Sequence, residues 1–152
     1  MARVSAEIDV DAPLEEVEGL WYDLRRWPSF VDGFARVAKR EQDWPQTGGR
    51  LVWDSTPAGR GRVLERVKEH TAGRGQVADV EDPRMRGVQE VRFEPLQDGT
   101  AVGLQLDYQL KDRTPFTPLV DLLFIRRSLR DSLRRTLTRL ARELKADAEL
   151  VQ

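Results

Sequence analysis

Cysteine is absent from this chain of 152 residues, and histidine occurs only once, at His70. The missing thiols exclude disulfides, cysteine nucleophiles and thiolate metal sites. A single imidazole also excludes the multi-histidine clusters that hold zinc in many enzymes. We therefore expect no metal, no cofactor and no covalent intermediate.

Long apolar runs are lacking as well. The first residues, MARVSAEIDV, contain no signal-peptide segment, and no stretch approaches the roughly 20 apolar residues of a membrane span. An excess of positive charge is also missing, because 25 basic and 26 acidic residues give a net charge of −1. A dedicated nucleic-acid-binding protein would show a basic excess. We expect a cytoplasmic protein that forms one domain over residues 1–152 and does not bind nucleic acid.

The first thirty residues predict a strand followed by two short helices. Apolar and polar residues alternate from Val4 to Val10, which is typical of a half-buried strand. Asp11-Ala12-Pro13 ends this strand, and proline suits the first turn of the helix that follows, up to Leu24. Trp27-Pro28 interrupts that helix, because the residue before a proline avoids helical geometry. A second short helix is predicted over Pro28–Asp32.

Six further strands are predicted in the middle of the chain, each separated from the next by turn-forming residues. Asp98-Gly99 lies between the last two and is the strongest hairpin signal in the sequence. Such short links imply antiparallel pairing. The predicted strands are Ala35–Glu41, Arg50–Ser55, Arg62–His70, Gly75–Glu81, Val88–Pro95 and Ala101–Lys111.

A long helix is predicted over Leu119–Ala146, where apolar residues recur every three or four positions. These residues are Leu122, Ile125, Leu129, Leu133, Leu137, Leu140 and Leu144. The opposite face carries seven arginines: Arg126, Arg127, Arg130, Arg134, Arg135, Arg139 and Arg142. Such a face is usually solvated. The alternative of a weakly bound anionic partner, such as a membrane surface or RNA, stays open.

Together these elements predict an α+β fold in which a curved, seven-stranded antiparallel sheet wraps around the long C-terminal helix. The apolar face of the sheet and the apolar stripe of the helix must cover each other. One helix is only about 10 Å across and cannot fill a wide curved sheet. We therefore expect an apolar cavity between sheet and helix, closed at one end by the two short helices.

The opening segment VSAEIDVDAPLEEVEGLWYDLRRWPSF resembles the START/polyketide-cyclase superfamily, also called SRPBCC. The similarity lies in the first strand, the acidic Ala-Pro step, the aromatic pair Trp21-Tyr22 and the turn at Trp27-Pro28. It implies the helix-grip fold over nearly the whole chain. The superfamily includes lipid and sterol carriers, quinone-binding proteins, polyketide aromatase/cyclases and a ribosome-associated toxin, so the resemblance leaves the function open.

Seven residues are predicted to line the cavity, because they share the apolar faces of the strands and of the long helix. They are Trp53, Gln89, Phe93, Leu106, Tyr108, Leu129 and Leu133. Gln89 offers a donor and an acceptor, and the Tyr108 hydroxyl needs a partner, which is a ligand oxygen, a backbone carbonyl or water. Arg92 is predicted to point outward, and a reversed register would instead bury its charge.

The function that demands least of these residues is binding or carriage of a small hydrophobic ligand, such as a lipid, a quinone or an aromatic polyketide-like molecule. The first alternative is a polyketide aromatase/cyclase or dehydratase, which requires a positioned acid–base pair. His70 is the only imidazole available as a base, but no carboxylate stands at a fixed spacing from it. The second alternative is a ribosome- or membrane-interaction module that uses the arginine face. Nothing in the sequence predicts the oligomeric state.

Overall fold

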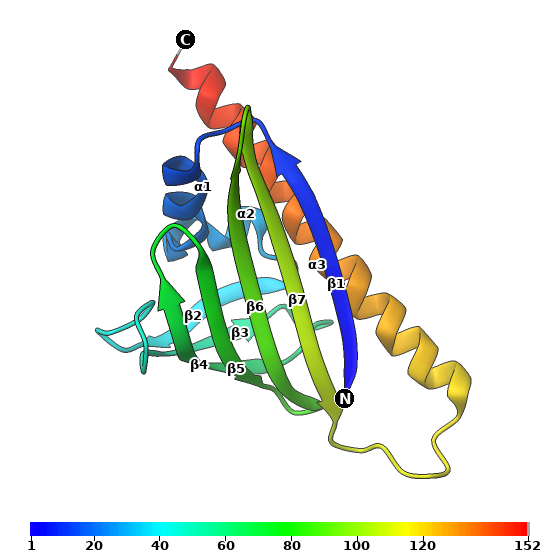
Figure 1. The fold of residues 1–152 in the computed structure, drawn as a ribbon. Coiled ribbons are helices and arrows are strands. Elements are labelled where there is room, and N and C mark those ends of the chain that lie inside the picture. The colour runs from blue at the N-terminus through cyan, green and yellow to red at the C-terminus, as the bar shows by residue number, and fades with distance from the viewer. Residues whose placement is uncertain (152) are drawn as a thin grey trace.

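The computed structural model describes residues 1–151 and has the predicted helix-grip architecture (Figure 1). Its helices are α1 (Leu14–Trp21), α2 (Trp27–Phe30) and α3 (Leu119–Leu150), with a 3-10 turn at Leu24–Arg26. Its strands are β1 (Ala2–Val10), β2 (Phe34–Arg40), β3 (Arg50–Ser55), β4 (Arg62–Thr71), β5 (Gly75–Glu81), β6 (Met85–Leu96) and β7 (Gly99–Leu110).

All seven strands form one antiparallel sheet in the order β1-β7-β6-β5-β4-β3-β2. From β2 to β7, each strand pairs with the strand that follows it in the sequence. The exception is β1, which pairs with β7, the last strand of the chain. Figure 1 shows α3 running beside β1, with α1 and α2 close to its C-terminal half. The arrangement confirms the predicted wrapping of a curved sheet around the last helix.

The sheet has one buried face because its strands alternate as predicted. In β7, Thr100, Val102, Leu104, Leu106 and Tyr108 are buried, and the residues between them are partly exposed. This period of two follows from the pleat of an extended chain, which points successive side chains to opposite faces.

The predicted hairpin at Asp98-Gly99 is confirmed. Leu96 pairs with Gly99, so that Gln97 and Asp98 form a two-residue turn between β6 and β7. Gly99 has a φ of 116°, and a Cβ atom at this position would collide with the carbonyl oxygen of Val10. Glycine is therefore required both by the backbone conformation and by the close approach of the chain that follows β1.

Some boundaries differ from the prediction. α1 ends at Trp21, three residues earlier than predicted, because Asp23 accepts a hydrogen bond from the Arg25 N–H and begins the 3-10 turn. β6 begins at Met85 instead of Val88. The Asp82 side chain accepts hydrogen bonds from the N–H groups of Arg84 and Met85, which closes the turn early and lets pairing begin at once.

The long helix has fully buried residues only from Leu133 onward, although Ile125 and Leu129 also pack against the core. Its buried residues are Leu133, Thr136, Leu137, Leu140 and Leu144, and no residue within 119–132 is fully buried. Asp32, which follows α2, receives hydrogen bonds from Ser132, Arg135 and Arg139 and so ties the helix to the rest of the fold. No helix within residues 1–151 combines the length and the apolar character needed to cross a bilayer.

Candidate ligand-binding site

A cavity of about 460 Å³ lies between the N-terminal half of α3 and the end of the sheet where β3 turns into β4 and β5 turns into β6. The fully buried residues of α3 begin at Leu133, and the turns before it, where Ile125 and Leu129 are only partly buried, leave space beneath them. Its apolar walls include Trp53, Met85, Leu110, Phe124, Ile125 and Leu129.

Trp53 is a rigid part of this wall. It is 3% exposed, and its ring packs against Phe34 and Trp27 at centroid distances of 5.5 and 6.4 Å. The indole Nε1 donates a hydrogen bond of 2.7 Å to Glu65 Oε2. One edge-on and one tilted aromatic contact, together with the fixed N–H, restrict the orientation of this ring, which suits a wall for a flat apolar molecule.

Two charged residues from separate turns meet at the cavity. Arg60 Nε donates a hydrogen bond of 2.8 Å to Asp82 Oδ2, and the Asp82 side chain is only 2% exposed. The other carboxylate oxygen is occupied by the backbone N–H groups of the turn that follows. Arg60 Nη2, however, is buried and has no hydrogen-bond partner within residues 1–151. Arg60 borders the cavity, so its guanidinium keeps an unused donor next to the cavity, although Nη2 itself is covered by protein atoms.

Glu65 is buried on β4, where it accepts the hydrogen bond from Trp53. Burial raises the pKa of its carboxyl, and the Trp53 hydrogen bond and the charge of Arg60 offset only part of that rise. Glu65 also borders an enclosed void of about 10 Å³ together with Gln76 and Gln89. This volume is close to the minimum that one water molecule needs, so it holds no organic ligand.

The seven predicted lining residues divide into three groups. Trp53 and Leu129 line the cavity, and Gln89 borders the small void. The remaining four are buried on the same inner surface but lie outside the cavity lining: Phe93, Leu106, Tyr108 and Leu133. Their inward orientation is confirmed, but the centre of the sheet is filled by core side chains and the open space lies at its turn end. Contact of any of the seven with a ligand stays a prediction.

Arg92 and His70 are placed away from the cavity. Arg92 points outward, as predicted, and its Nε lies 3.0 Å from Glu90 Oε1. His70 is the last residue but one of β4, with its Nδ1 2.9 Å from Gln46 Oε1 and its ring edge-on to Tyr22. It is partly buried in this aromatic contact. Neither side chain lines the cavity.

The polar residues of the site were missed by the sequence analysis. Glu65 carried a usable signal, because it alternates with Val63 and Val67 and so had to share their buried face. Arg60 and Asp82 carried none, since they lie 22 positions apart in two turns that only the folded sheet brings together. Within residues 1–151, no three histidine, aspartate or glutamate side chains gather as a metal ion would require.

A larger hollow, of about 760 Å³, lies over β5 and β6. It is bordered by many charged side chains, among them Glu7, Glu69, Arg74, Glu90, Arg92 and Glu94. Most of these alternate with the core residues of their strands and therefore belong to the outer face of the sheet. A small apolar ligand needs apolar walls, so the cavity beneath α3 is the better candidate.

Comparison with known proteins finds one matching family model and many solved structures with a similar fold. The family model described as polyketide cyclase/dehydrase and lipid transport matches residues 1–145. No curated protein matches the chain by sequence.

Solved structures match over nearly the whole chain. A START superfamily protein from Mycobacterium smegmatis has a TM-score of 0.74 and 15% identity, and the match covers 95% of this chain and 97% of the other. A protein from Thermus thermophilus also has a TM-score of 0.74, with 23% identity and coverage of 96% and 99%. The di-domain ARO/CYC StfQ from the steffimycin biosynthetic pathway has a TM-score of 0.75 and 17% identity, covering 97% of this chain and 51% of StfQ. At these identities the similarities establish the fold.

Proposed function

Because this chain belongs to the polyketide cyclase/dehydrase and lipid transport family, we propose that it binds a small hydrophobic molecule with an oxygen acceptor at one end. The ligand occupies the cavity between α3 and the sheet. One observation carries the proposal: the cavity combines apolar walls with a buried Arg60 N–H that has no partner within residues 1–151.

The size of the cavity supports ligand binding. Its volume of about 460 Å³ lies within the usual range of small-molecule sites, roughly 300 to 1,000 Å³. Burying roughly 300 Å² of apolar ligand surface would contribute about 7.5 kcal/mol at 25 cal/mol per Å². Association costs must be subtracted from this gain. A hydrogen bond from a charged donor adds about 1.5 to 3 kcal/mol, so affinity and selectivity both depend on Arg60.

Binding is better supported than acid–base catalysis. An aromatase/cyclase or dehydratase needs a carboxylate or imidazole that is free to accept a proton. Four carboxylates border the cavity: Asp112 and Asp121 are exposed to solvent, and Asp82 is held by Arg60 and two backbone N–H groups. Asp32 is held by Ser132 and two arginines; burial raises its pKa, but these contacts outweigh burial and lower it. The lowered pKa makes Asp32 a weak base.

The first test fills the cavity. Leu129→Trp adds bulk at a half-buried position of the wall, and it should abolish binding of the neutral apolar probe N-phenyl-1-naphthylamine. Leu123→Trp is the matched control, because this exposed leucine lies on the same helix but outside the cavity lining. Probe fluorescence is titrated against both variants. Unchanged binding in a folded Leu129→Trp protein would refute the proposed cavity.

The second test addresses the polar end. Arg60→Lys keeps a positive charge for Asp82 but removes the unpaired Nη2. Affinity for the ketone probe prodan should fall roughly tenfold, which corresponds to the loss of about one hydrogen bond. Affinity for N-phenyl-1-naphthylamine, which has no oxygen acceptor, should stay the same. Equal losses for both probes would mean that Arg60 supports the cavity and does not recognise the ligand.

A further inference from the structure

The loop after β7 and the first turns of α3 expose an unusual amount of apolar surface. Five large apolar residues, which we call the apolar tip, are 55–91% exposed: Phe116, Leu119, Val120, Leu123 and Phe124. They make up half of the ten large exposed apolar residues in the described chain, although they lie within nine consecutive positions. Isolated exposed apolar residues are ordinary, but a contiguous group of this kind marks an interaction surface.

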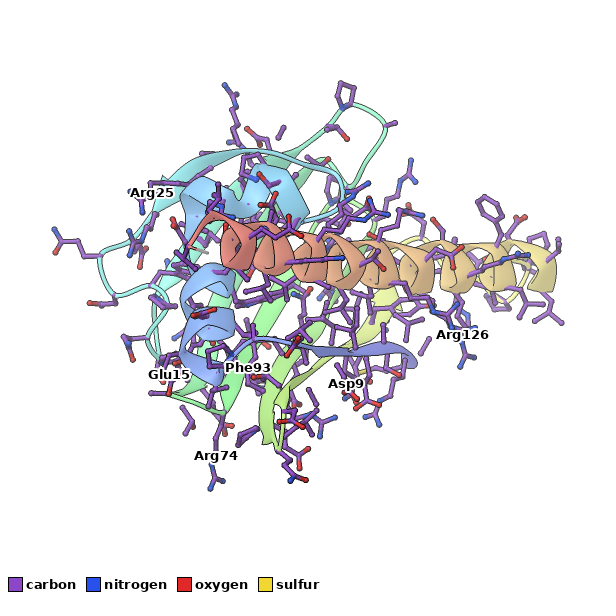
Figure 2. All side chains as sticks on the ribbon, turned by 90° about the horizontal axis from the view of Figure 1, so that it is seen from above. Asp9, Glu15, Arg25, Arg74, Phe93 and Arg126 are labelled. Atoms are coloured by element: carbon purple, nitrogen blue, oxygen red, sulfur yellow. The ribbon has the colours of Figure 1, made fainter. Side chains whose placement is uncertain are left out.

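The apolar tip is exposed because nothing within residues 1–151 packs against it. Figure 2 shows α3 from above, with its N-terminal end projecting beyond the sheet and Arg126 beneath this projecting half. The buried part of the helix starts only at Leu133. The tip also adjoins the cavity, because Phe124 and Thr117 are among the cavity-lining residues.

Four arginines follow the apolar tip along α3. Arg126, Arg127, Arg130 and Arg134 line a surface hollow of about 340 Å³ together with Leu123 and a single carboxylate, Asp131. None of the four forms an ion pair with any residue from 1 to 151, whereas Arg135 and Arg139 are both paired with Asp32.

Positive charge is therefore concentrated in one segment of the chain. Between Lys111 and Arg135 there are seven basic and three acidic residues, although the chain as a whole has a net charge of −1. A local basic cluster in an otherwise acidic protein attracts anionic surfaces to that cluster alone.

We propose that this end of α3 docks on an anionic lipid bilayer. The apolar tip enters the boundary between headgroups and acyl chains, and the four unpaired arginines contact lipid phosphates. Helices that lie on membranes combine these two features, an apolar face and adjacent basic residues. A second copy of the chain fits less well, because a symmetric contact would place these arginines against one another. The inference does not depend on the ligand, but docking would bring the cavity to the membrane surface.

The absence of cysteine makes a direct test simple, since one introduced thiol can carry a polarity-sensitive NBD label. Leu123→Cys places the label in the apolar tip, and Leu64→Cys places it at a 49% exposed position on β4 as the matched control. With vesicles in which one lipid in three is phosphatidylglycerol and the rest phosphatidylcholine, the label at 123 should shift to the blue and brighten. The label at 64 should not respond. No response at 123, or equal responses at both sites, would overturn the proposal.

A second experiment separates the arginines from general charge. Two triple variants remove three positive charges each: R127Q/R130Q/R134Q on α3, where Arg130 is partly buried and the other two are exposed, and R66Q/R74Q/R86Q at exposed positions on β4, the β4–β5 turn and β6. In co-sedimentation, the α3 variant should lose roughly a hundredfold in partitioning to the same vesicles. The sheet variant should bind like wild type; Figure 2 shows Arg74 far from Arg126.

High salt should weaken wild-type binding, because exposed charges are screened. Equal losses in the two triple variants would overturn the proposal. A blue shift at position 123 that needs no vesicles and grows with protein concentration would also overturn it, by identifying a second copy of the chain as the occupant.

Discussion

Replacing Glu65 with glutamine should change how the stability of the protein depends on pH. Glu65 is buried on β4, and burial raises its pKa above the usual value of 4.5. The folded chain therefore keeps this proton at pH values where the unfolded chain has lost it. Glutamine has nearly the same size, and its amide oxygen can still accept the hydrogen bond from Trp53 Nε1.

The sign and slope follow from proton linkage. Below the unfolded pKa both states are protonated, and the stabilisation associated with Glu65 is complete. As the pH rises from there towards the folded pKa, the folded state holds one more proton than the unfolded state, so the free energy of unfolding falls. One proton gives a slope of at most about 1.4 kcal/mol per pH unit. For a domain of this size the unfolding temperature would fall by roughly 3 to 6 °C per pH unit.

The assay is urea unfolding of wild type and Glu65→Gln, followed by tryptophan fluorescence from about pH 4 to about pH 8. The stability of wild type minus that of the variant should fall as the pH rises. Glu69→Gln, which removes an exposed carboxylate from the same strand, controls for the loss of one negative charge. A difference that rises with pH would refute the reasoning, because it would mean that Arg60 and Trp53 outweigh burial.

Two further predictions concern the anchoring of α3. Leu133→Asp places an unpaired charge in the core and should cost several kcal/mol; an unchanged unfolding temperature would show that Leu133 does not face the sheet. Asp32→Asn should cost about 1 to 2 kcal/mol near neutral pH, because the arginines it pairs with are partly exposed. The lowered pKa of Asp32 provides stability above the usual value of 3.8 that is lost as the pH falls through the folded pKa. The difference from wild type should therefore shrink in acid, and an equal loss in acid and at neutral pH would contradict this.

The fold could be predicted because its signals are local. The alternation of β7 and the three-and-four spacing of the leucines in α3 each fix which face of an element is buried, whatever the rest of the chain does. The hairpin at Asp98-Gly99 is likewise specified by the conformational needs of two or three residues. At Asp23 and Asp82 a side-chain hydrogen bond decides where the element ends or begins. There the apolar pattern predicted a boundary three residues away from the observed one.

The cavity could be predicted only in part, because its position depends on tertiary geometry. Alternation correctly placed Trp53 on the inner face, and the helical pattern correctly placed Leu129 towards the sheet. The alternation of apolar and polar residues does not determine the distance between α3 and each part of the sheet. It therefore could not distinguish inner-face residues that line the cavity from those in the packed core. It assigned Leu106 and Phe93 to the wall, although both lie where the core is packed.

The length of α3 explains why the cavity and the apolar tip occur together. At 1.5 Å per residue, the 14 residues from 119 to 132 extend about 21 Å beyond the first buried leucine. One side of this segment forms the cavity wall, and its remaining sides have no partner within residues 1–151. Phe124 belongs to both surfaces, so a substitution there would alter ligand binding and membrane docking at once. Leu129 lies only in the cavity wall and Leu123 only in the tip. Changes at these two positions can therefore attribute an effect to one surface or the other.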